Sequence, residues 1–239
     1  MKLAILYEDN EYVFINKPSG ILSIPDRHNA EIPNITGALR KIYGNIFIVH
    51  RLDRETSGCI CFAKDEATHR YTSKLFETRD VEKFYRGIIH GTPPTPNGRI
   101  EEAIMEHPTI KGKMIINAKQ GKPSITEYET LESFGMFSYL SFKLLTGRTH
   151  QIRIHCSNMG NPLVCDGLYG KDNPVFISSL KKRYHLSKNE EEEMPILSRI
   201  GLHAYQLTFK HPNGKLLSIE APLPKDMSAM LNQCRKWLK

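Results

Sequence analysis

Short segments in which apolar residues alternate with polar ones, or run together, recur along the whole chain and predict strands. The last two of them enclose Asn213-Gly214, a pair that favours the tight turn of a β-hairpin. Asn16 to Gly20 reads as the turn after the second strand. The predicted strands cover residues 3–7, 12–16, 47–49, 59–63, 83–90, 137–144, 202–210 and 216–220.

Two helices are predicted in the first third of the chain. Thr36 is a candidate N-cap for a short helix over residues 37–43, which Gly44 would end. Asp65 is a candidate N-cap for a longer helix that reaches about Arg79. The spacing along this longer helix predicts a buried face made of Ala67, Tyr71 and Leu75.

Two further helices are predicted in the second half. The first covers residues 149–159 and ends at Gly160. Its buried face should be Ile152, Cys156 and Met159. The second begins behind a candidate cap at Asp226 and runs to the C-terminus. Its apolar stripe predicts core packing for Met227, Met230, Leu231, Cys234, Trp237 and Leu238.

Mixed strands and helices, with hairpin signals, indicate an α+β fold. A chain of 239 residues suits one large domain or two intimately packed subdomains. Residues 171–199 stand apart as an expected variable insertion, because they carry the charge blocks Lys181-Lys182-Arg183 and Glu190–Glu193. Such blocks are usually solvated surface, although the basic one could contact a polyanion.

The composition is that of an ordinary globular protein, with 40% hydrophobic and 25% charged residues. The formal net charge of +7 supports a polyanionic partner such as RNA, and general solubility is the alternative explanation. We find no apolar run that could span a bilayer and no secretory signal. Five scattered cysteines argue against a disulfide framework and favour the reducing cytoplasm.

One charged loop lies between two apolar segments. Asp53 sits in the run His50–Gly58, between the predicted strands at 47–49 and 59–63, and Thr56-Ser57-Gly58 reads as a turn signal. A rigid scaffold often holds a reactive group in such a loop. A polar hairpin loop with a salt bridge is the alternative interpretation.

The run His50–Gly58 also resembles the signature loop of the RluA-type pseudouridine synthases, in which the Asp is catalytic. Other segments resemble further motifs of this family and follow in its order. One such motif is weak evidence, whereas five in order are strong evidence. The additional matching segments are residues 16–23, 83–85, 145–155, 161–166 and 202–204.

The resemblance covers roughly the whole chain and implies a fold. Members have a central mixed, mostly antiparallel sheet that is bent into two subdomains with the active site in the cleft between them. We therefore expect residues 1–239 to form a single pseudouridine synthase catalytic domain, with the insertion at about 171–199. The S4-like N-terminal domain that many relatives carry is expected to be absent.

The implied reaction breaks the N1–C1′ bond of uridine, turns the detached base and rejoins it through C5. Because no atom is gained and no redox change occurs, neither a cofactor nor a metal is expected. Asp53 is the candidate catalytic residue. It could act as a nucleophile, or as a base and electrostatic partner of an oxocarbenium-like sugar, and the sequence leaves this choice open.

Arg148 is the second candidate, because it lies at the N-terminal end of a predicted helix, where a cation opposes the helix dipole. An anionic partner would explain it, and the resemblance implies pairing with Asp53. The resemblance aligns Tyr85 with an aromatic residue that stacks on the target base. It also implies that Arg51 fills the gap left by the displaced uridine and that Leu202 lines the uracil pocket. The alternatives are an exposed arginine bonded to carbonyls for Arg148 and an ordinary half-buried strand residue for Tyr85. For Arg51 the alternative is a structural salt bridge, and for Leu202 it is a core leucine on a strand.

The leading hypothesis is therefore a monomeric RNA pseudouridine synthase that acts on uridines in structured rRNA, tRNA or both. A catalytically inactive RNA-binding protein that acts as an RNA chaperone is the alternative from another class. A nucleoside glycoside hydrolase is a third hypothesis, but it would usually need a second carboxylate as general acid.

Overall fold

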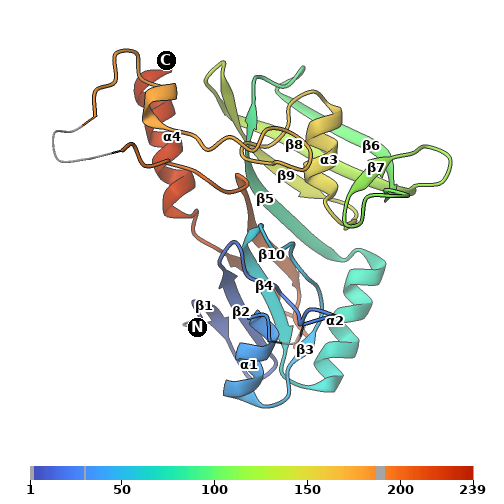
Figure 1. Ribbon diagram of the computed structural model, residues 1–239. Coiled ribbons are helices and arrows are strands. Elements are labelled where there is room, and N and C mark those ends of the chain that lie inside the picture. The colour runs from blue at the N-terminus through green and yellow to red at the C-terminus, as the bar shows by residue number, and fades with distance from the viewer. Residues whose placement is uncertain (1–2, 30, 187–191, 239) are drawn as a thin grey trace. The chain divides into compact units, whose positions relative to one another are not determined.

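Two compact units make up the computed structural model, which describes residues 3–29, 31–186 and 192–238 (Figure 1). The first unit contains Met1–Tyr85 and His203–Pro222, and the second contains Arg86–Leu202 and Leu223–Lys239. Both units combine a sheet with helices. The α+β class and the mostly antiparallel pairing predicted from the sequence are therefore confirmed.

The sheet of the first unit is built around β4, a strand in which every residue is buried. Strands follow the order β1-β2-β4-β10, with β3 paired to β4 and β11 paired to β10. All of these pairs are antiparallel except β4 with β10, which is parallel. The elements are β1 (Ile5–Glu8), β2 (Tyr12–Lys17), α1 (Ile35–Tyr43), β3 (Phe47–Ile48), β4 (Ser57–Ala63), α2 (Glu66–Thr78), the start of β5 (Val81–His90), β10 (Leu202–Lys210) and β11 (Leu216–Glu220).

Side chains of β2 and β4 alternate between two hydrophobic clusters, one on each face of this sheet. Tyr12 and Phe14 belong to the cluster that Leu75 and Phe76 of α2 pack against. Val13, Ile15, Ile60 and Phe62 belong to the other cluster, together with Ile35 and Leu39 of α1. Because successive strand residues point to opposite faces, an almost continuous apolar run is what a sheet covered on both sides requires.

The helix ends of the first unit confirm some predictions and correct others. Asp65 caps α2 and Arg79 follows its end, as expected. The N-cap of α1 is Asn34, whose side chain accepts the amide of Gly37 at 2.7 Å. The prediction of Thr36 as the cap was wrong, because its hydroxyl donates instead to the Ser23 carbonyl, 2.8 Å away.

The buried face predicted for α2 was wrong for Ala67, whereas Leu75 packs against the core and Tyr71 is half-buried. Ala67 is exposed, and the fully buried residues of the helix are Thr68 and Thr72. The Thr72 hydroxyl lies 2.6 Å from the Tyr12 hydroxyl, and that of Thr68 donates to Asp65. Burial of a hydroxyl costs little when it is hydrogen-bonded, so threonines can occupy positions where apolar residues were expected.

The second unit contains a sheet with the order β5-β9-β8-β6-β7. The sequence did not reveal β6, β7 and β8. In β8 the buried positions are the polar Ser124 and Thr126 together with Tyr128, whereas Ile125 is only half-buried, so the hydrophobic pattern gave no strand signal. Besides the end of β5, the elements are β6 (Asn97–Glu106), β7 (Met114–Ile116), β8 (Lys122–Ser133), β9 (Phe137–Leu144), α3 (Gln151–Asn158), η1 (Ile177–Ser179) and α4 (Lys225–Trp237).

The two predicted helices of this unit begin one or two residues away from their expected starts. The first begins at Gln151, and Met159 beyond its end is half-buried. Pro224 precedes α4, so Asp226 lies in its first turn and was wrongly predicted as the cap. It instead binds the Arg199 guanidinium through two hydrogen bonds of 2.6 and 2.7 Å.

The predicted core stripe of α4 is confirmed for its first four members and wrong for Trp237. Met227, Met230, Leu231 and Cys234 are buried, whereas Trp237 is 37% exposed. The ammonium groups of Lys181 and Lys236 lie 4.9 and 4.7 Å from its ring centroid.

The expected insertion contributes Val175, Leu180 and Leu197 to the same core. Of its acidic block, Glu190 and Glu191 lie outside the described residues. Among the described helices, none is long and apolar enough to cross a membrane.

Candidate active site

Asp53 lies half-buried in the loop that joins β3 to β4 in the first unit. The chain turns at Arg54 and Glu55, and β4 already begins at Ser57. The turn predicted at Thr56-Ser57-Gly58 was therefore wrong. Gly58 has a φ of +118° and lies so close to β10 that an added Cβ would be 2.2 Å from the Ala204 carbonyl oxygen, so both its backbone conformation and its packing require glycine.

The buried ammonium of Lys17 binds backbone carbonyls of this loop and of the turn after β2. Lys17 is 0% exposed, and its Nζ donates to the carbonyls of Pro18, Ile21 and Arg54 at 3.0, 2.7 and 2.9 Å. Hydrogen bonds from a charged donor are stronger than those between neutral groups. The cation therefore ties the turn after β2 to the residue that follows Asp53.

Further hydrogen bonds from residues 19–23 fasten the carbonyls on both sides of Asp53. Ser23 Oγ donates to the Leu52 carbonyl at 2.8 Å and accepts the Leu52 amide at 3.1 Å. Ser19 Oγ donates to the Glu55 carbonyl at 2.6 Å. The Gly20 amide donates to the Arg54 carbonyl at 2.9 Å. With its neighbours fixed, the backbone of Asp53 is held in one position, which favours accurate placement of a reactive carboxylate.

His50 supports the start of the loop. Its Nε2 accepts the Cys61 amide at 3.0 Å, and its ring stacks on Phe76 with centroids 5.0 Å apart. Burial, and secondarily the positive charge of Lys83, lowers the pKa of His50 to about 3. The imidazole is thus neutral at physiological pH and serves as a hydrogen-bond acceptor. Arg51, the next residue, is exposed.

Tyr85 comes from β5 and packs against the cluster that contains Leu52. Burial raises the pKa of its phenol well above the usual value, and the negative charge of Asp53 raises it further. The phenol therefore stays protonated at physiological pH and experiences the field of the Asp53 carboxylate. The first unit thus brings together two of the candidate catalytic residues, Asp53 and Tyr85.

Arg148 belongs to the second unit, in a turn that Gln151 holds in place. Gln151 Oε1 accepts the Arg148 amide at 3.0 Å and the Thr146 hydroxyl at 2.8 Å. Its Nε2 donates to the Ile125 carbonyl at 3.0 Å. Within the described residues, the buried Nε of Arg148 has no hydrogen-bond partner. This leaves a cationic donor available for an anionic group.

Leu202 is the last of the predicted site residues, and a buried ion pair was not predicted. Leu202 is 3% exposed at the first position of β10, as either a core or a pocket residue would be. Arg153 forms a buried bidentate pair with Asp166, with two N–O distances of 2.8 Å. The sequence reasoning assigned no role to this pair or to Lys17, because a charged residue gives no sequence signal of its burial.

Asp9, Glu11 and His211 form the one described cluster with metal-ligand geometry, with ligand atoms within 4.8 Å of one another. His211 Nδ1 accepts the Asn213 amide at 3.1 Å, so its proton resides on Nε2. That proton points to Asp9 Oδ2, 3.1 Å away. Internal hydrogen bonds therefore account for this cluster.

Comparison with known proteins yields a consistent set of relatives. Residues 11–158 match the family described as RNA pseudouridylate synthase. The chain is 35% identical over 242 residues to the ribosomal large subunit pseudouridine synthase D of Neisseria meningitidis serogroup B, covering 98% of this chain and 62% of that protein. The Escherichia coli protein of the same name is 32% identical, with 98% of this chain and 71% of that protein covered.

A solved structure agrees with these sequence matches. Human RNA pseudouridylate synthase domain containing 4 superimposes with a TM-score of 0.73 at 25% identity, over 97% of this chain and 93% of the human one. The chain thus spans less than two thirds of the Neisseria protein but nearly all of the solved human chain.

Proposed function

The chain belongs to the RNA pseudouridylate synthase family, and from this premise we propose that it isomerises uridine in RNA to pseudouridine. The observation that carries the proposal is the fastening of the Asp53 loop by Lys17, Ser19, Gly20 and Ser23. Every backbone carbonyl from Leu52 to Glu55 accepts a hydrogen bond, so the backbone that carries the Asp53 carboxylate is held in one position.

Asp53 is the proposed catalytic carboxylate. The reaction cleaves N1–C1′, forms C5–C1′, removes the proton from C5 and delivers one to N1, so the product is an isomer of the substrate. A carboxylate can stabilise the positive charge that develops on the sugar, either as a nucleophile or through space. The protonated phenol of Tyr85 is proposed to stack on the base and to assist proton transfer at C5.

Arg148, Arg51 and Leu202 complete the proposed set. The available Nε of Arg148 supports a role in binding an anionic group of the site or of the RNA. The exposure of Arg51 beside Asp53 supports a role in filling the stack from which the uridine has been displaced. Leu202 is proposed to line the uracil pocket.

Ribosomal RNA of the large subunit is the proposed substrate, because it is what the names of the relatives state. We further propose that the protein acts as a monomer in the cytoplasm. The free cysteines of the described chain are all buried, which is consistent with a reducing compartment.

The decisive experiment maps pseudouridine by carbodiimide derivatisation in a large-subunit rRNA transcript and in a tRNA transcript after incubation with the protein. Wild-type protein should form pseudouridine in rRNA without releasing free uracil. Asp53→Asn should fold and form none. Glu55→Gln, a carboxylate change two residues away, should retain activity. Product formation by Asp53→Asn would refute the assignment, and modification of tRNA alone would refute the substrate.

A further inference from the structure

A positively charged segment surrounds β7, at the edge of the sheet in the second unit. Residues 107–126 contain Lys111, Lys113, Lys119 and Lys122 but no Asp or Glu. Two of these lysines precede β7 and two follow it. Within the described parts of the chain, none of the four ammonium groups forms an ion pair or a side-chain hydrogen bond. The neighbouring strand β6 carries Glu101, Glu102 and Glu106, but none of these pairs with the four lysines in the described chain, and the ammonium groups remain able to bind a polyanionic partner.

The backbone of β7 offers hydrogen-bonding groups on its outer side. This strand pairs with β6 and ends the strand order. The Asn117 amide donates to Ala103 and the Lys113 carbonyl accepts from His107, both at 2.8 Å. Because antiparallel strands direct alternate residues toward the partner, Met114 and Ile116 direct their backbone groups outward. The Met114 amide already meets the Tyr169 hydroxyl at 2.7 Å.

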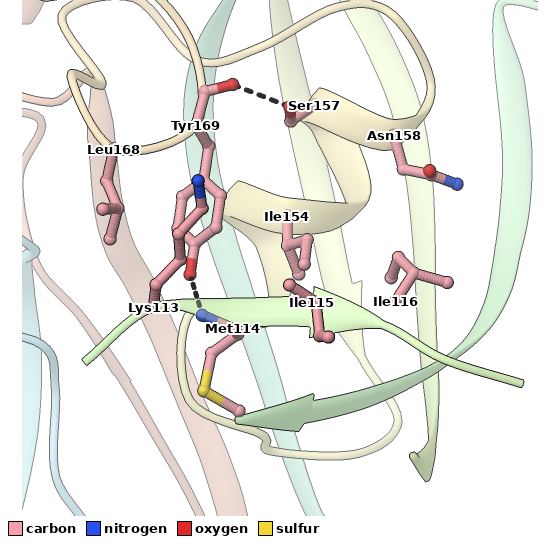
Figure 2. Close-up of a pocket in the computed structure, with 9 residues that line it drawn as sticks. All are labelled: Lys113, Met114, Ile115, Ile116, Ile154, Ser157, Asn158, Leu168 and Tyr169. Carbon is pink, nitrogen blue, oxygen red and sulfur yellow. Dashed lines mark hydrogen bonds between the residues drawn. The ribbon is translucent and has the colours of Figure 1, made fainter. Parts of the chain in front are cut away.

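A cavity of about 490 Å³ lies beside this edge, between β7, α3 and residues 168–169 (Figure 2). Its size is in the range of pockets that bind small molecules. Figure 2 shows the Tyr169 ring at one end and the side chains of Ile116 and Asn158 at the other. The lining combines apolar side chains with a few polar groups. The lining residues are Lys113, Met114, Ile115, Ile116, Ile154, Ser157, Asn158, Leu168 and Tyr169.

The wall of the cavity is held in place before any ligand arrives. The Tyr169 hydroxyl lies 2.9 Å from His150 Nδ1 in addition to its bond with the Met114 amide. Ser157 Oγ donates to the Tyr169 carbonyl at 2.7 Å. A pre-formed wall lowers the entropic cost of binding.

We propose that this β7 surface binds a strand of the substrate RNA away from the target uridine, with one unpaired base in the cavity and the flanking phosphates on the four lysines. RNA recognition commonly combines phosphate contacts with unstacked bases held in pockets. The inference rests on the proposed function, because it takes RNA as the partner.

Charge decides which part of the RNA occupies each position. Glu102 lies 3.4 Å from the amide of Asn158, at the end of the cavity away from Tyr169. A carboxylate repels phosphate but accepts hydrogen bonds from the amino group of a base. The base therefore belongs in the cavity, and the phosphates belong on the lysines that precede and follow β7. A peptide that extended the sheet would use the backbone edge but would leave the lysines without partners.

A charge-matched pair of variants tests the lysines. In one variant Lys111, Lys113, Lys119 and Lys122 are changed to Gln. In the control, the exposed lysines Lys41, Lys210, Lys215 and Lys225 are changed to Gln, so both variants lose the same charge. Affinity for the rRNA transcript is measured by filter binding across a salt series. The β7 variant should bind at least about tenfold more weakly at ~0.15 M salt, with a shallower salt dependence, because each lost phosphate contact removes about 0.7–0.9 from the slope.

Equal losses in the two variants would refute the surface, because only the net charge would then matter. Pseudouridine formation by the wild-type protein is followed on the same RNA. Absence of product would refute the proposed function, while the binding comparison would still decide whether the β7 surface contacts RNA.

A crosslinking experiment tests the cavity. The rRNA transcript is made with 4-thiouridine, irradiated in complex with the wild-type protein, and the crosslinked peptides are identified by mass spectrometry. Crosslinks are expected in residues 113–116 and at Tyr169, and Asn158→Trp, which fills the cavity, should abolish them. Crosslinks confined to other parts of the chain, or unchanged by Asn158→Trp, would overturn the assignment.

Discussion

Replacement of Lys17 by Met tests whether the buried ammonium fastens the loop that carries Asp53. Met has a similar length and no charge, so it fills the same space without donating a hydrogen bond. The change removes donors at 3.0, 2.7 and 2.9 Å from the carbonyls of Pro18, Ile21 and Arg54. We expect a less stable protein and a slower reaction.

The size of the loss follows from the partners that remain. The Arg54 carbonyl keeps the Gly20 amide at 2.9 Å. Pro18 is exposed, so its carbonyl can bind water, whereas Ile21 is half-buried. An unsatisfied buried carbonyl costs about 1–3 kcal/mol, and a hydrogen bond from a charged donor contributes about 1.5–3 kcal/mol. The variant no longer carries the cost of burying a cation, which offsets part of the loss of hydrogen bonds. We expect the free energy of unfolding to fall by about 2–4 kcal/mol in total.

Urea unfolding and single-turnover pseudouridine formation measure the two effects. Lys41→Met is the matched control, because Lys41 is an exposed lysine on α1. The control should change stability by less than about 0.5 kcal/mol. If Lys17→Met were as stable and as active as this control, the ammonium would not hold the Asp53 loop.

Three further predictions concern the surroundings of this loop. Gly58→Ala should destabilise the protein by at least about 3 kcal/mol, because the new Cβ would lie 2.2 Å from the Ala204 carbonyl oxygen. Gly112→Ala, at a position with open space around it, should lower stability by only about 1 kcal/mol. Equal stabilities of the two alanine variants in thermal unfolding would contradict this. Burial lowers the pKa of His50 to about 3, so its contribution to stability is present above the ordinary pKa of 6.5 and is lost as the pH falls toward 3. Between about pH 7 and pH 4, the free energy of unfolding of His50→Gln in urea should therefore fall by roughly 1–3 kcal/mol less than that of the wild-type protein. The same pH dependence in both proteins would exclude this role of His50. Burial raises the pKa of Tyr85 in the folded protein, whereas in the unfolded chain the phenol ionises at its ordinary pKa of 10.0. The stability of the wild-type protein should therefore decline above about pH 10, and that of Tyr85→Phe should decline less. Unfolding followed at about pH 9 and pH 11 checks this, and parallel curves would show that burial of the phenol does not matter.

Hydrophobic periodicity predicted the elements whose burial is carried by apolar side chains. The run in β4 and the hairpin of β10 and β11 were found because apolar residues and Asn213-Gly214 mark them. It failed where polar residues form the interior. In β8 the buried Thr126 hydroxyl contacts Gln151 and His155, and the buried Ser124 hydroxyl donates to the Lys122 carbonyl. Polar residues therefore occupy two of the three buried positions of this strand, and the apolar alternation is lost.

For the candidate site, the order of the motifs located the Asp53 loop and Tyr85. The structure added that both lie in the first unit, where Tyr85 packs against the cluster that contains Leu52. Burial raises the pKa of Tyr85 and the negative charge of Asp53 raises it further, so the phenol lies within the field of the carboxylate in the first unit. The sequence could not show that Arg148 keeps a buried Nε without a partner in the described chain, because this depends on how its turn packs.

The sequence by itself determined the α+β class, the order of the motifs and the positions of the residues that carry the proposed chemistry, since these depend on local pattern. Only the tertiary structure decided which charged residues are buried. Lys17 reaches the carbonyl of a residue 37 positions away, and Arg153 pairs with Asp166 across 13 positions. A charged group can be buried only where distant parts of the chain provide its partners, and no local pattern specifies such an arrangement.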